Sequence, residues 1–93
     1  METRVALIGI VVEDQNSVEK LNEILHQYKQ YIIGRMGIPY RIKEFNLISI
    51  AIDAPADVIS TLAGKIGMLP GVNTKSVYAK YTNKEGGGHE DVN

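Results

Sequence analysis

The residues best suited to bind a charged ligand lie in the segment GRMGIPYR, residues 34–41. Arg35 and Arg41 can each donate charged hydrogen bonds to a carboxylate or a phosphate, and Gly37 would let the backbone come close to a bound molecule. Pro39 would fix one backbone angle, so we predict a rigid turn beside a hairpin. The alternative is a structural turn whose glycines adopt positive φ and whose arginines are solvated or paired with acidic groups.

A second distinctive segment, GKIGMLPGV at residues 64–72, is explained by chain geometry. Gly67 is expected to end a helix in the left-handed conformation, and Pro70 would stop that helix from continuing. Gly71 would tighten the turn before the last strand. This interpretation needs no ligand.

The residue types do not indicate a metal site or a catalytic site. His26 and Glu23 lie on the polar side of an expected helix and could share a metal ion, but a tight transition-metal site normally has three or four protein ligands. The chain contains no cysteine and no GxxxxGK[ST] phosphate loop. We therefore expect no cofactor, no metal site and no enzymatic activity.

The composition points to one small domain without a strong surface charge. Ten Lys and Arg against eleven Asp and Glu give the 93 residues a formal net charge of −1, which argues against non-specific binding to nucleic acid. The apolar run from Val5 to Val12 is too short for a membrane span and lacks a signal-peptide cleavage pattern. We expect a cytoplasmic location, with no membrane contact and no direct contact with nucleic acid.

Two apolar segments are the elements that must position these residues. RVALIGIVV, residues 4–12, and NLISIAID, residues 46–53, are apolar on both alternating faces, which is typical of central strands covered on both sides. Apolar residues at helical spacing predict one helix near residues 17–31 and a shorter one from Pro55 to Gly67.

The remaining strands complete a β-α-β-β-α-β order. One begins near residue 32 or 33 and pairs as a hairpin with residues 47–53, and the last covers residues 72–81. This order predicts an α+β fold of the ferredoxin-like type, in which two helices cover one face of a four-stranded antiparallel sheet. Residues 1–81 would form the domain, and residues 82–93 would be a disordered tail because they carry little apolar surface.

Such a fold leaves one apolar sheet face without helices. That face would expose several hundred Å² of apolar surface unless a second subunit covers it, so we predict a homodimer or a homotetramer. The alternation alone does not assign the central-strand residues to one face or the other. The residues predicted at the subunit interface are Ile8, Ile10, Ile50 and Tyr78.

Three segments resemble a known family: VVEDQNSVEKLNEIL, IIGRMGIPYR and ISTLAGKIGMLPGVNTKS. They are similar to proposed regulators of the iron-only hydrogenase system, small ACT-like proteins that are similar in turn to the C-terminal sensing domain of nickel-responsive repressors. The resemblance implies a regulator of transcription or of hydrogenase maturation. It also places Lys65 beside an effector cleft at a subunit interface. The candidate ligand-binding residues are therefore Arg35, Met36, Gly37, Tyr40, Arg41 and Lys65.

The sequence departs from the nickel-responsive repressors in two ways. Their ribbon-helix-helix arm would precede this domain, and no residues come before Met1, so we expect that the chain does not act on DNA alone. Their nickel ligands include histidines on the strand that here reads LISIAID, where every such position is aliphatic or small. The resemblance therefore does not carry over the nickel site.

Two functions stay open at this point. The first is a homo-oligomeric sensor that binds a small molecule at a subunit interface and passes the change to a partner in hydrogenase maturation or expression. The second is a ligand-free assembly factor whose oligomeric surface docks on a hydrogenase-maturation protein.

Overall fold

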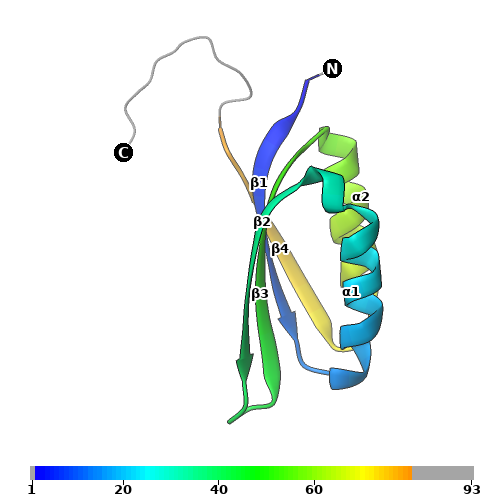
Figure 1. The fold of residues 1–93 in the computed structure, drawn as a ribbon, viewed down its shortest axis with the longest axis vertical. Helices are drawn as coiled ribbons and strands as arrows, with labels where there is room; N and C mark the ends of the chain where they lie inside the picture. The colour runs from blue at the N-terminus through cyan, green and yellow to red at the C-terminus, as the bar shows by residue number, and fades with distance from the viewer. Residues whose placement is uncertain (1, 81–93) are drawn as a thin grey trace.

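The computed structural model describes residues 2–80, which form a four-stranded antiparallel sheet with both helices on one side (Figure 1). The elements are β1 (Arg4–Val12), η1 (Gln15–Ser17), α1 (Val18–Gln27), η2 (Lys29–Tyr31), β2 (Ile32–Tyr40), β3 (Phe45–Ala54), α2 (Ala56–Gly67) and β4 (Val72–Tyr78), where η marks a short 3-10 helix. The strand order is β2-β3-β1-β4. This arrangement confirms the predicted α+β fold of the ferredoxin-like, ACT-like type.

Alternation along the central strands decides which side chains reach the helices. In β1, Ala6, Ile8 and Ile10 are buried, whereas Leu7 and Gly9, which alternate with them, are exposed. Ile8 and Ile10 therefore fill the space under the helices, where each fully buried aliphatic side chain contributes roughly 1.5–3 kcal/mol.

The helices complete this core through one apolar stripe each. Leu21 and Leu25 are buried on α1, and Ile59, Leu62 and Ile66 are buried on α2, all at helical spacing. The buried side chains of the strands and those of the helices form one core, so the sheet and the two helices stabilise one another.

The first helix is shorter than the sequence predicts. The α-helix ends at Gln27 instead of residue 31, because Tyr28 leaves the helical region with φ −110° and ψ 16°. The chain then makes the tighter turn of η2 and enters β2 directly. Tyr28 and Tyr31, whose ring centroids lie 6.4 Å apart, pack against the core at this bend.

The segment GRMGIPYR is a strand for most of its length, so the predicted turn is wrong. Gly34 to Tyr40 lie in β2 and pair with β3, and the turn of this hairpin is formed by residues 41–44. Because β2 is an edge strand, the nitrogen of Pro39 can face solvent instead of β3. The proline then removes no ladder hydrogen bond and does not end the pairing. The ladder has an irregularity between Ile32 and Gly34, near the start of the strand.

The glycine that adopts a positive φ is not one of those for which the sequence predicted it. Within residues 2–80, Gly71 is the glycine with positive φ, at +68°, so the left-handed end of α2 predicted at Gly67 is wrong, as is the positive φ considered for Gly37. A Cβ on Gly71 would lie 2.6 Å from the Cβ of Asp14. The Gly71 carbonyl also accepts a hydrogen bond of 2.7 Å from the backbone N–H of Glu13. Gly71 thus ties the turn before β4 to the turn after β1.

The last strand ends at Tyr78, earlier than the predicted residue 81. Tyr81 and the predicted tail of residues 82–93, which includes His89, lie outside the described residues. No helix within residues 2–80 has the length and apolar character needed to cross a membrane.

Candidate functional site

The sheet surface turned away from the helices is the most unusual surface of the described chain, and we call it the open face. Figure 1 shows the sheet nearly edge-on, with α1 and α2 on one side and neither helix on the other. The open face is formed by Val5, Leu7, Gly9 and Val11 of β1, Gly34, Met36, Ile38 and Tyr40 of β2, Phe45, Leu47, Ser49, Ala51 and Asp53 of β3, and Asn73, Lys75 and Val77 of β4. Its composition is therefore mainly apolar.

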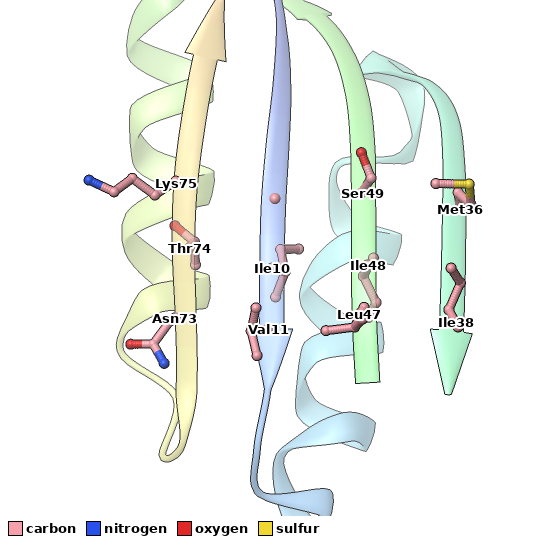
Figure 2. Close-up of a pocket in the computed structure, with 11 residues that line it drawn as sticks. Ile10, Val11, Met36, Ile38, Leu47, Ile48, Ser49, Asn73, Thr74 and Lys75 are labelled. Atoms are coloured by element: carbon pink, nitrogen blue, oxygen red, sulfur yellow. The ribbon is translucent and has the colours of Figure 1, made fainter. Parts of the chain in front are cut away.

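A shallow depression of about 520 Å³ lies in the middle of the open face, and we call it the hollow. Gly9 makes its floor because a glycine on the central strand raises no side chain there, and the register places Gly9 beside Ser49 on β3 and Lys75 on β4. Figure 2 looks onto this surface, with the strands in front and the helices behind. The hollow is thus a consequence of two small residues in neighbouring central strands.

The walls of the hollow are apolar, with polar groups toward one side. Met36 and Ile38 come from β2, and Val11 and Leu47 come from the central strands (Figure 2). Asn73 and Lys75 stand on β4, and the Lys75 side chain extends outward from the edge of the sheet. An apolar concavity with a few polar groups is the usual form of a small-molecule site.

The predicted ligand-binding residues do not meet in one place. Met36 and Tyr40 lie on the open face, but Arg35 lies on the helix side of β2, where its Nη2 donates a hydrogen bond of 2.7 Å to Oδ1 of Asn22 on α1. Gly37 is also on the helix side, opposite Ile48. Because successive strand residues point to opposite faces, the segment divides its side chains between two surfaces.

The other two predicted donors are also separate. Arg41 begins the hairpin turn, six residues after Arg35, which corresponds to roughly 20 Å along a strand. Lys65 lies on α2, where its Nζ is 5.2 Å from the ring centroid of Tyr28, within the range of a cation–π contact. The two arginines therefore do not form one anion-binding pair within a single chain.

A second, smaller depression of about 390 Å³ lies beside the hairpin turn and includes two of the predicted residues. Tyr40 and Arg41 line it together with Gln15 and Asn46. The Gln15 side chain already donates to the carbonyl of Glu44 at 2.9 Å and accepts from Nδ2 of Asn46 at 3.1 Å. These bonds hold η1 against the hairpin, which explains the cluster structurally.

Three of the four residues predicted at a subunit interface belong to the core. Ile8 and Ile50 are fully buried, Ile10 is 2% exposed, and all three side chains lie under the helices. Tyr78 is half-buried at the end of β4, where the Arg4 guanidinium lies 4.6 Å from its ring centroid. The residues available to a partner are instead their neighbours on the open face.

The residues that shape the hollow were not predicted from the sequence. Gly9 has no side-chain functional group, and the uncharged polar groups of Ser49 and Asn73 match no catalytic or metal-binding motif. The available signal was side-chain size, since Gly9 and Ser49 alternate with the large isoleucines of β1 and β3. Small residues alternating with large ones indicate that the large set faces the helices.

Metal ligands do not gather in the described part of the chain. No three His, Cys, Asp or Glu side chains among residues 2–80 lie close enough together to hold a metal ion. His26 and Glu23 are both exposed on α1.

Comparisons with known proteins identify a family and a fold. The model of the TM1266-like family, described as "Iron-only hydrogenase system regulator, putative", matches residues 4–76. The structure of an uncharacterised protein, TM1266 from Thermotoga maritima, is 32% identical in sequence with a TM-score of 0.82, and the match covers 85% of this chain and 100% of that chain.

A more distant likeness concerns the fold alone. A formyltetrahydrofolate deformylase from Pseudomonas putida KT2440 has a TM-score of 0.60 at 11% identity, over 83% of this chain and 29% of that chain. No curated protein matches the sequence. Because the match covers residues 4–76, which include both helices and at least part of every strand, the chain belongs to the TM1266-like family.

Proposed function

We propose that this protein is a regulatory module of the iron-only hydrogenase system that binds a small molecule in the hollow of the open face. The observation that carries the proposal is the hollow itself, a concave apolar surface with Ser49, Asn73 and Lys75 among its lining residues. Its volume of about 520 Å³ lies within the roughly 300–1,000 Å³ usual for ligand pockets. The family description supplies the cellular system.

The module would act by binding and not by chemistry. A ligand in the hollow contacts all four strands, so its occupancy can change the surface that the sheet presents to a partner in hydrogenase maturation or expression. The formal net charge of −1 supports action through a protein partner instead of direct contact with nucleic acid. A cytoplasmic location fits this role.

The proposal is tested by a thermal-shift screen with amino acids, nucleotides, small carboxylic acids and divalent metals. Gly9→Met would fill the hollow, because a Cβ at Gly9 has room beside the Lys75 carbonyl, 3.8 Å away. Gly64→Met is the matched control, since no atom lies within 4 Å of a Cβ at Gly64 on α2. A true ligand raises the melting temperature of the wild type and of Gly64→Met, but not of Gly9→Met.

The second candidate is a ligand-free assembly factor, and the openness of the hollow favours it. The hollow is a depression in an exposed surface, which suits a protein side chain as well as a free molecule. If no compound in the screen changes the melting temperature while purified hydrogenase-maturation proteins bind the wild type and not Gly9→Met, the assembly role is correct and the sensor role is wrong.

A further inference from the structure

We propose that a second copy of this chain covers the open face, so that two sheets pack face to face and enclose the hollow between them. The inference does not depend on a ligand, because it rests on the apolar surface, its charges and its shape in the chain alone.

The amount of exposed apolar surface is the first argument. Six large aliphatic residues of the open face, Val5, Leu7, Met36, Ile38, Leu47 and Val77, are each between 38% and 67% exposed. Together they present on the order of 500 Å² of apolar surface, if each fully exposed residue presents roughly 150–200 Å². A standard interface buries about 800 Å² per partner, of which about 65% is apolar in homodimers, so it needs roughly 500 Å² of apolar surface. The open face matches that requirement.

The size of the domain is the second argument. A chain of 93 residues buries roughly 60–65% of its unfolded surface, which leaves a small core, and its helices protect one side of the sheet. Ala6, Ile8 and Ile10 are buried within the chain, whereas Leu7, on the same strand, is 52% exposed. A second sheet would cover the exposed face of β1 as the helices cover its buried face.

The charges identify the partner as another copy. The open face carries one carboxylate, Asp53 on β3, and one ammonium group, Lys75 on β4, among otherwise uncharged residues. A two-fold interface places each residue against a second one and repeats the contact with the roles exchanged. Asp53 of each copy can therefore pair with Lys75 of the other. A strongly charged partner would instead meet a face whose two charges cancel.

The shape of the open face also suits pairing with a second copy of itself. Leu7 and Leu47 rise on the two central strands, and Gly9 and Ser49 lie low beside them. A surface with both a ridge and a hollow can pack against a rotated copy of itself, since the ridge of each copy enters the hollow of the other. The space that stays between the copies would be closed to solvent only in the pair, so the ligand site would be incomplete in one chain.

The first experiment measures mass by light scattering without any added ligand. The wild type should show the mass of two chains of 10.3 kDa at micromolar concentration, or of a tetramer built from such pairs. Met36→Lys should raise the dissociation constant by roughly 100-fold, because an ammonium group would enter the apolar contact. Met68→Lys is the matched control, since Met68 is 85% exposed at the end of α2 and should leave the mass unchanged. Circular dichroism checks that each variant is folded.

The second experiment identifies the surface in contact. The chain has no cysteine, so Ser49→Cys and Ser60→Cys each introduce a single thiol, on the open face and on the exposed side of α2. A maleimide should modify Ser49→Cys at least 10-fold faster after dilution to monomer, whereas the rate for Ser60→Cys should not change. A wild type that stays monomeric at micromolar concentration overturns the proposal, as does a dimer in which both thiols react at the monomer rate. Neither outcome depends on the ligand screen, which tests the sensor role separately.

Discussion

Gly71→Ala should destabilise the protein strongly, because two separate features of the structure oppose a side chain at this position. Gly71 has a φ of +68°, in the left-handed region that costs an L-residue other than glycine roughly 1–2 kcal/mol. A Cβ would also lie 2.6 Å from the Cβ of Asp14 and 3.1 Å from its backbone nitrogen. Backbone cannot move aside as a flexible side chain can, so one of the two turns must shift.

The magnitude follows from what that shift disturbs. The Glu13 N–H donates to the Gly71 carbonyl at 2.7 Å, and Oδ1 of Asp14 accepts from the backbone N–H of Asn16 at 2.9 Å. Weakening either bond costs about 0.5–1.5 kcal/mol. Added to the backbone term of roughly 1–2 kcal/mol, the loss of one such bond gives a total of about 1.5–3.5 kcal/mol. In a domain of this size this corresponds to a fall in melting temperature of roughly 10–25 °C.

Urea denaturation followed by circular dichroism is the assay, at one protein concentration because association would add to the apparent stability. Gly64→Ala is the control, since it lies in α2 with no atom within 4 Å of a Cβ, and it should stabilise the protein by about 0.5–1 kcal/mol. Opposite signs for the two substitutions support the reasoning. A loss below about 0.5 kcal/mol for Gly71→Ala would refute both the backbone term and the steric term.

Three further substitutions test the core, a buried hydrogen bond and an exposed one. Ile50→Asp should abolish folding, because Ile50 is fully buried and an unpaired carboxylate there costs at least about 4 kcal/mol, whereas Ala51→Asp on the open face should still give a folded chain by circular dichroism. Ser17→Ala should lower the free energy of unfolding in urea by about 1–3 kcal/mol, because the buried Ser17 hydroxyl donates to the Pro70 carbonyl at 2.7 Å. Arg35→Ala should change that free energy by no more than about 0.5 kcal/mol, because this side chain is exposed; a larger loss would show that its hydrogen bond to α1 supports the fold.

The topology was predictable because its signals are long and repeated. Val18, Leu21 and Leu25 recur at helical spacing over several turns, and the two isoleucine-rich strands extend over eight or more residues. The segment with Gly37 and Pro39 was misread for the opposite reason. Glycine and proline are turn residues only on average, and an edge strand, whose identity depends on the whole sheet, tolerates both.

The candidate site was less predictable because its position depends on which face of the sheet the helices cover. Both faces of β1 are apolar, so alternation alone divides Ile8 from Leu7 without saying which of them is buried, and the small side chains at Gly9 and Ser49 are the signal that separates the two faces. The role of Gly71 likewise depends on Asp14, which is distant in sequence and approaches only in the folded chain. Contacts of this kind leave no local pattern.

The two edges of the sheet differ in their capacity for strand addition. The β2 edge contains Pro39 and begins with an irregular ladder, whereas β4, from Val72 to Tyr78, has no proline and pairs with β1 in unbroken register. Edge strands that carry a proline or a bulge resist pairing with a further chain. A filament formed by adding sheet to sheet needs two competent edges on every molecule, and the sheet within residues 2–80 offers one. Any strand addition at β4 would therefore stop at a pair, which protects a small and partly apolar protein from open-ended aggregation.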